Sequence, residues 1–130
     1  MVLVDSSIWI AFEHGRYDLF AVIGEDEEVA TCPIVLHEIL RGTRNTARYE
    51  LALEMLANVT MLDSPTPLER FEQAARLYLD CREHGVTPSS ADCLVAACAI
   101  THGIPLLHAD HDFDAIARCS RLEIFTRSAS

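Results

Sequence analysis

Short apolar runs alternate along the chain with longer stretches whose apolar residues recur every three or four positions. The runs predict buried strands at residues 2–4, 29–31, 59–62, 104–108 and 122–125. The longer stretches predict amphipathic helices at residues 33–41, 67–84 and 89–102. Three further helices are predicted around Trp9 and Phe12, around Tyr49 and Leu56, and from near residue 112. Strands that alternate with helices favour an α/β fold, in which a mostly parallel sheet is covered by helices on both faces.

The longest predicted helix has both a start signal and an apolar face. Thr66-Pro67-Leu68-Glu69 has the pattern of a capping box with proline at the first helical position. The side chains predicted to form its buried face are Leu68, Phe71, Ala75 and Tyr78. At the start of the chain, Ser6-Ser7 offers an N-cap for the helix that carries Trp9.

Composition and charge narrow the class of protein. The chain has 130 residues, half of them apolar, which is the size of one domain, and we expect a single domain over 1–130. The longest apolar run, residues 93–100, is too short to cross a bilayer, and the first arginine of this lysine-free chain is Arg16. The five cysteines form no C-x-x-C pair. We therefore expect a cytoplasmic protein with reduced, buried cysteines and no membrane segment.

The net charge of −10 argues against a simple nucleic-acid binder but is compatible with a site that holds cations. Asp5 directly follows the first predicted strand, and Asp110 follows the fourth, so both fall on the edge where parallel sheets bind ligands. Asp92 lies in the first turn of the helix that leads into the fourth strand. Glu38 shares the inward face of its helix with Ile34, where an isolated carboxylate is costly.

Each of these acids also has a plain structural explanation. Asp92 favours the dipole at a helix N-terminus, and Asp110 is in position to cap the helix that starts near residue 112. Asp5 suits a turn, and Glu38 is three residues from a possible partner, Arg41. The joint pattern of four acids beside apolar runs favours a metal site over four separate explanations.

The sequence around these acids resembles the PIN domain, specifically the VapC-like toxin nucleases of bacterial toxin–antitoxin modules. The matching segments, in chain order, are VLVDSS at 2–7, PIVLHEIL at 33–40, ADCLVAA at 91–97 and LLHADHDF at 106–113. Any one of these segments is a weak signal, but four in this order across nearly the whole chain are specific. The resemblance implies a three-layer α/β/α fold with a mostly parallel five-stranded sheet in the order 3-2-1-4-5.

The resemblance also implies an activity, which is Mg²⁺-dependent hydrolysis of RNA phosphodiester bonds, with Mn²⁺ able to substitute. The implied catalytic and metal-binding acids are Asp5, Glu38, Asp92 and Asp110, with Asp112 as a possible fifth ligand. We expect Asp5 and Asp92 to hold the principal ion, because a hard cation takes a few carboxylate oxygens and keeps several waters. Ser6 matches a residue that helps to orient the site, whereas Asp114 is interpreted as a solvated helix residue.

The partners implied by the resemblance are an RNA substrate, a cognate VapB-like antitoxin and a second copy of the chain in a homodimer. Arg41, Arg44 and Arg48 recur at helical spacing and form either a basic stripe for RNA or an ordinary solvated face. Arg118, Arg121 and Arg127 make the C-terminal end locally basic in the same way. The alternative function is a catalytically inactive PIN-like module that binds proteins, with vestigial acids.

Overall fold

The computed structural model describes residues 1–126 and has a small parallel sheet at its centre. Strand β1 (Val2–Val4) pairs with β2 (Val29–Thr31) on one side and with β4 (Leu106–Leu107) on the other. Strand β3 (Thr60–Met61) pairs with β2, so that the order is β3-β2-β1-β4 and every pairing is parallel. The parallel sheet and the predicted order of its first four strands are confirmed.

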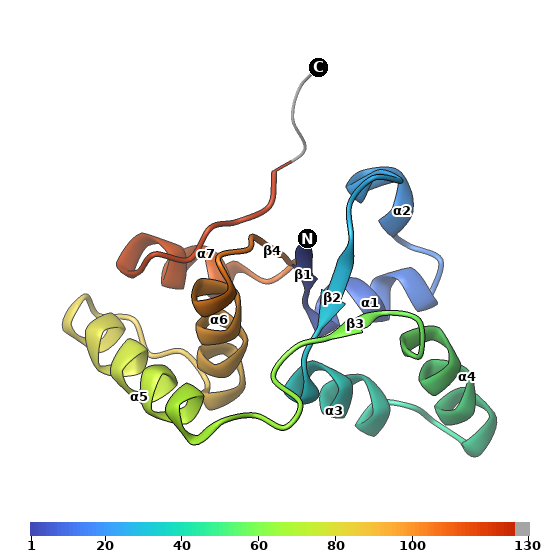
Figure 1. Ribbon diagram of the computed structural model, residues 1–130, viewed down its shortest axis with the longest axis horizontal. Helices are drawn as coiled ribbons and strands as arrows, with labels where there is room; N and C mark the ends of the chain where they lie inside the picture. The colour runs from blue at the N-terminus through green and yellow to red at the C-terminus, as the bar shows by residue number, and fades with distance from the viewer. Residues whose placement is uncertain (127–130) are drawn as a thin grey trace.

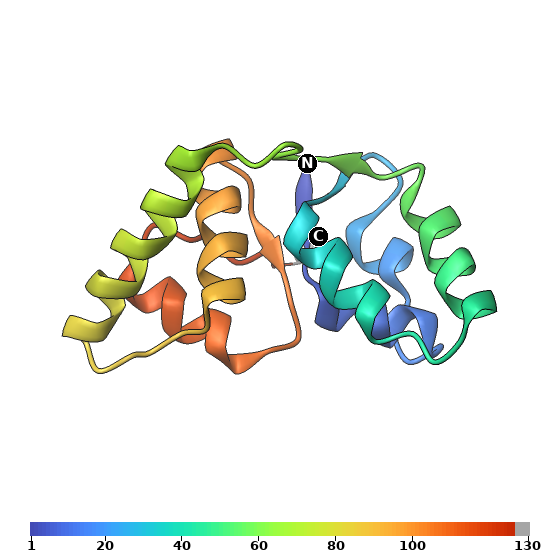
Figure 2. The same cartoon turned by 90° about the horizontal axis from the view of Figure 1, so that it is seen from below.

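Seven helices surround the strands in the described part of the chain (Figure 1). They are α1 (Ser6–Glu13), α2 (Leu19–Ile23), α3 (Pro33–Arg41), α4 (Thr46–Leu56), α5 (Leu68–Glu83), α6 (Ser90–His102) and α7 (His111–Cys119). Figures 1 and 2 show two groups, α1–α4 on the side of β2 and β3, and α5–α7 on the side of β4. Because α3 packs against α6, the two groups meet beside the sheet.

The sheet is buried most deeply at β1, whose three residues have no exposed surface. Trp9 of α1 and Phe113 of α7 are the largest fully buried side chains, and they belong to the same core as β1. This core fixes the carboxyl end of β1 relative to α1, α3, α6 and α7, from which the candidate site residues project.

The fifth strand, predicted at residues 122–125, is reduced to an isolated parallel bridge between Ile124 and Leu106. Its backbone contacts are the Leu106 N–H with the Glu123 carbonyl at 2.9 Å and the Phe125 N–H with the Leu106 carbonyl at 2.8 Å. Since β4 itself spans only two residues, a neighbouring segment has little edge to pair with, and the regular sheet has four strands.

The prediction for the buried face of α5 is wrong. The buried residues of this helix are Arg70, Ala74, Leu77 and Cys81. On the face predicted to be buried, Leu68 is 75% exposed and Phe71 is 49% exposed. The predicted capping box does not form either, because Thr66 Oγ1 donates to the Asp63 carbonyl at 2.7 Å and Pro67 occupies the N-cap position.

Two helix starts differ from the sequence prediction. Asp5, rather than Ser6 or Ser7, is the N-cap of α1. The short helix α2, capped by Asp18, was not predicted, because five residues are too few to show helical periodicity.

The described cysteines are all unpaired, and four of the five are buried, while Cys119 is partly exposed. Over residues 1–126, none of the helices is both long enough and apolar enough to cross a membrane.

Candidate metal centre

Asp5 lies where β1 ends and α1 begins, and its side chain is almost fully buried. Its Oδ2 accepts hydrogen bonds from the backbone N–H of Ser7 at 3.1 Å and from the Ser7 hydroxyl at 2.7 Å. The Ser7 hydroxyl also accepts from the N–H of Ala109, in the loop after β4, at 3.1 Å. Asp5 therefore caps a helix, and Ser7 connects it to the loop that carries Asp110.

Glu38 is half-buried on α3 and faces the start of α1. The Ser6 hydroxyl donates to its Oε1 at 3.4 Å, which is a long hydrogen bond but agrees with the predicted orienting position of Ser6. Burial raises the pKa of Glu38, and the negative charge of Asp5 raises it further. Arg41 forms no ion pair with Glu38, although its charge acts to lower the pKa of that carboxyl group, so a close pair with Arg41 does not explain the position of Glu38.

Asp92 occupies the first turn of α6, where its backbone N–H donates to the Ser89 hydroxyl at 3.1 Å. Burial raises the pKa of its carboxyl group to about 6, and the charges of Asp5 and Asp110 contribute, with a smaller effect from Glu38. An aspartate at a helix N-terminus normally has its charge stabilised by the dipole. Here the pKa is shifted in the opposite direction, mainly by the loss of solvent and then by repulsion from the other acids.

Asp110 caps α7, and its Oδ1 accepts from the N–H of Asp112 at 3.0 Å. The plain structural explanation of Asp110 as a helix cap is thus correct, but it is incomplete. One carboxylate oxygen each from Asp92, Asp110 and Asp112 lies within 4.8 Å of the other two. Asp5 and Glu38 lie outside this closest group, although their charges act on Asp92.

His108, in the loop after β4, and Asp114, in the first turn of α7, support this group. The N–H of Asp110 donates to Nδ1 of His108 at 3.0 Å, which leaves Nε2 to carry the proton that is shared with Oδ1 of Asp114 at 3.1 Å. The interpretation of Asp114 as a purely solvated residue is therefore wrong. Ser7 and Asp114 were not expected to contribute, since their hydrogen bonds depend on contacts across the turns rather than on a spacing in the sequence.

Acidic side chains without basic partners dominate the site. Across the described residues, none of the ion pairs includes Asp5, Glu38, Asp92 or Asp110. Such a group can protonate, separate or bind a cation. Its donor atoms are carboxylate oxygens, partly exposed at Asp92 and Asp110, and these fit a hard divalent ion such as Mg²⁺ or Mn²⁺ that keeps part of its water shell.

The predicted basic stripe does not lie on one helix, because α3 ends at Arg41 and α4 begins after a turn. Arg44 and Arg48 instead join Arg16 around a groove of about 580 Å³ between α1, α3 and α4. Of the C-terminal arginines, Arg118 and Arg121 are exposed, and Arg127 lies outside the described residues.

Comparison with known proteins agrees with this arrangement. The PIN-domain family profile matches residues 2–118. Ribonuclease VapC11 of Mycobacterium tuberculosis is 32% identical over 130 residues, which covers 95% of this chain and 96% of the relative. The chain is a PIN domain of the VapC family. Ribonuclease VapC1 of Rickettsia felis is 31% identical over 136 residues, and the match covers 98% of this chain and 97% of the relative.

Solved structures of other proteins share the fold of this VapC-family chain. The VapBC-5 toxin–antitoxin structure from Mycobacterium tuberculosis matches with a TM-score of 0.72 and 26% identity over 94% of each chain. VapBC2 from Rickettsia felis, bound to a DNA fragment from its promoter, matches with a TM-score of 0.77 and 18% identity. The match covers 96% of this chain and 98% of that one.

Proposed function

We propose that this chain is a divalent-metal-dependent endoribonuclease that acts as the toxin of a toxin–antitoxin pair. The observation that supports this proposal most directly is the grouping of Asp92, Asp110 and Asp112, because one carboxylate oxygen of each lies within 4.8 Å of the other two. The pKa of Asp92, raised to about 6 by burial and by the charges of Asp5, Asp110 and Glu38, agrees with this grouping. Four acids from β1, α3, α6 and the β4–α7 turn thus act on one another, as expected of a cation site. The names of the VapC relatives support RNA as the substrate.

Because Asp5 lies outside the closest group of oxygens, we replace the expected pair of Asp5 and Asp92 and assign the metal, Mg²⁺ or Mn²⁺, to Asp92, Asp110 and Asp112. Asp5 and Glu38 complete the catalytic group. When bound, the ion supplies Lewis-acid polarisation of the phosphodiester and lowers the pKa of a coordinated water. Oε1 of Glu38 is engaged by Ser6, which leaves Oε2 to orient a water and accept its proton. Burial favours this role, because it raises the pKa of Glu38 towards the range of a useful base.

The groove between α1, α3 and α4 offers positive charge that RNA needs on a protein of net charge −10, since three arginines and one acid, Glu13, line it. Arg16, Arg44 and Arg48 line it, and Ile39 of its wall directly follows Glu38 on α3. We assign this groove to the phosphates of the RNA strand that leads into the site, since guanidinium groups pair well with phosphate oxygens.

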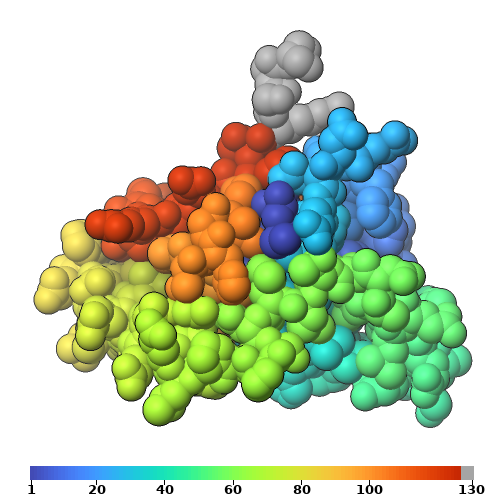
Figure 3. Space-filling view, viewed as in Figure 1, coloured from blue at the N-terminus to red at the C-terminus, as the bar shows by residue number. Residues whose placement is uncertain are grey.

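The uncovered apolar face of α5 supports a homodimer. Leu68, Phe71 and Leu79 are between 48% and 75% exposed, and α5 lies along the edge of the molecule (Figure 3). An apolar groove of about 450 Å³ runs beside them between α5 and α6. Exposed apolar faces of this kind mark protein interfaces, and we assign this one to a second copy of the chain. The VapBC complexes among the matching structures support a VapB-like antitoxin as a further partner.

RNA cleavage by the purified chain tests the proposed activity. We expect wild-type protein to cleave RNA when Mg²⁺ or Mn²⁺ is present and not when the metal is chelated. Asp5→Asn and Asp92→Asn should lose at least about a hundred-fold in rate, because each removes a charge from the group. Asp80→Asn, at an exposed position on α5, is the matched control and should retain full activity. Equal cleavage by all four proteins would instead indicate a contaminating nuclease and favour the inactive, protein-binding module.

A further inference from the structure

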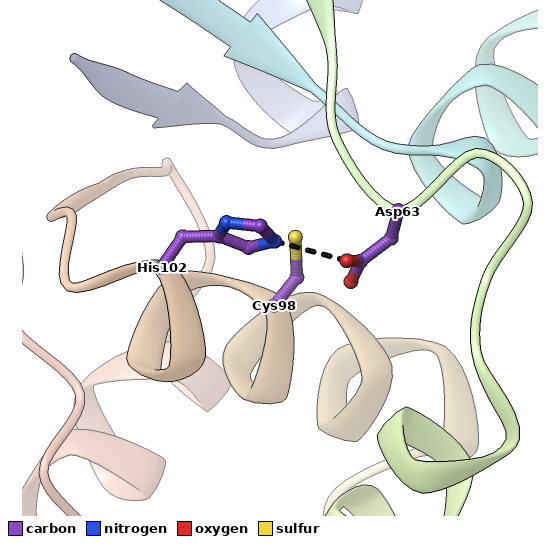
Figure 4. A group of neighbouring side chains, drawn as sticks. All are labelled: Asp63, Cys98 and His102. Carbon is purple, nitrogen blue, oxygen red and sulfur yellow. Dashed lines mark hydrogen bonds and ion pairs between the residues drawn. The ribbon is translucent and has the colours of Figure 1, made fainter.

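A second group of metal-ligand side chains lies apart from the acidic site. Asp63 follows β3, while Cys98 and His102 lie one turn apart on α6. One ligand atom from each lies within 4.8 Å of the other two. Figure 4 shows Cys98 and His102 projecting from α6 towards Asp63. Cys98 lies six positions after Asp92, which corresponds to about 9 Å along the helix.

We propose that Asp63, Cys98 and His102, together with Cys32, form a binding site for a thiol-preferring divalent cation such as Zn²⁺. Thiolate and imidazole ligands favour Zn²⁺, whereas carboxylate oxygens alone favour Mg²⁺. The i, i+4 spacing of Cys98 and His102 places both donors on one face of α6. The donor types therefore distinguish this site from the oxygen-only group around Asp92.

Cys32 supplies the fourth donor. It is the N-cap residue of α3, but its side chain makes no capping hydrogen bond. Its thiol lies near that of Cys98, close enough for each thiol to shift the pKa of the other. Both cysteines are at most 2% exposed, whereas the side chain of His102 is 34% exposed and offers a route for entry. Four donors of this kind match the tetrahedral shell of structural zinc.

Arg70 is the feature that most directly opposes a cation at this place. It donates to both oxygens of Asp63, from Nε at 2.7 Å and from Nη2 at 3.1 Å. A carboxylate that binds metal is commonly held by such an outer hydrogen bond. When both thiols are ionised, the three negative charges of the two thiolates and Asp63 equal the positive charges of one divalent ion and the Arg70 guanidinium. Zn²⁺ would replace the proton that His102 Nε2 and Asp63 Oδ1 now share at 2.9 Å.

The ligand atoms must move slightly closer together to bind the ion. Zn²⁺ with sulfur at about 2.3 Å and nitrogen at about 2.0 Å separates neighbouring tetrahedral ligands by about 3.3–3.8 Å. Asp63, Cys98 and His102 already offer ligand atoms within 4.8 Å of one another, whereas Cys32 lies outside this group, beside Cys98, and must approach further. The bound ion would join the start of α3, the loop after β3 and α6. We assign the ion a structural role. The other chemistry that Asp63, His102 and Cys98 suggest is a hydrolytic triad, but a triad needs a nucleophile that substrate can reach, and Cys98 is 1% exposed.

Co²⁺ titration of the full chain under a non-thiol reductant tests this site. A thiolate bound to Co²⁺ gives a near-ultraviolet charge-transfer band that carboxylate ligands cannot produce. We expect one equivalent of Co²⁺ to give this band, Zn²⁺ to abolish it, and proton release to accompany binding. Cys98→Ala should lose the band, and Cys32→Ala should weaken it. His102→Gln, at a partly exposed position, should weaken Co²⁺ binding at least about ten-fold and keep the fold.

Two controls identify the cysteines involved. Cys93→Ala removes the thiol next to Asp92, and Cys81→Ala removes another buried thiol, so both should keep the band. The proposal is overturned if wild-type protein shows no band near one equivalent, or if the band survives in Cys98→Ala. The result is independent of the proposed nuclease, because Asp92→Asn should abolish RNA cleavage while leaving the cobalt–thiolate band unchanged.

Discussion

Ser7 and Asp5 form the connection that links β1 to the loop after β4. The Ser7 hydroxyl donates to Oδ2 of Asp5 at 2.7 Å and accepts from the Ala109 N–H at 3.1 Å. We expect Ser7→Ala to lower kcat for RNA about ten- to a hundred-fold, because small displacements of catalytic groups are costly. The free energy of unfolding should fall by only about 0.5–1.5 kcal/mol. Ser6→Ala is the comparison, and its weaker 3.4 Å contact with Glu38 predicts a smaller loss of kcat.

The raised pKa of Asp92 predicts a stability effect with a defined pH dependence in metal-free protein. Because the folded-state pKa of about 6 exceeds the usual value of 3.8, ionisation of this carboxyl opposes folding. The penalty is absent below pH 3.8 and complete above pH 6. Asp92→Asn should therefore raise Tm at pH 7.5 in chelator and have little effect near pH 4. A lower Tm at pH 7.5 would contradict the repulsion assigned to this site.

Phe71 tests the homodimer surface on α5. A charge at this half-exposed position should not disturb the core but should prevent apolar association. We expect Phe71→Glu to be monomeric by light scattering at concentrations where wild-type protein is dimeric. Phe20→Glu, at an exposed aromatic position on α2, should leave the dimer intact. If Phe71→Glu remains dimeric, the interface lies elsewhere.

Arg44 and Arg48 test the assignment of the groove to RNA. Replacing both with alanine should raise KM for RNA several-fold and reduce the salt dependence of binding, because two phosphate contacts are lost. The value of kcat should change little, since neither side chain belongs to the acidic group. Arg82→Ala removes an exposed arginine of α5 and serves as the control. An unchanged KM in the double variant would reject this groove as the RNA path.

Local patterns predicted the elements that hold the acids, because those elements have strong signals. An apolar run followed by Asp5 predicted a buried strand end, and the helix from Pro33 to Gly42 was bounded by its own start and stop residues. The position of Glu38 on the inward face followed from helical periodicity. The close approach of the Asp112 carboxylate to those of Asp92 and Asp110 depends on how α7 begins. The spacing of these residues along the sequence could not predict it.

The error on α5 has a physical cause. This helix has two apolar stripes, and the one that is buried contains Arg70, which would normally mark a solvent face. Arg70 is buried because Asp63, from the loop after β3, pairs with it at 2.7 Å. A contact between residues seven positions apart across a turn is invisible to a pattern of apolar residues. The sequence therefore favoured the stripe that contains Phe71, which the structure leaves uncovered.

Mn²⁺ binding tests the central claim that these acids form one cation site. Titration calorimetry of wild-type protein and of Asp80→Asn should give the same affinity, because Asp80 lies on the exposed side of α5. Asp92→Asn and Asp110→Asn should each weaken Mn²⁺ binding at least ten-fold, since each removes one of the close oxygens. If both variants bind Mn²⁺ as tightly as wild-type protein, the acids do not hold the metal and the proposed mechanism is wrong.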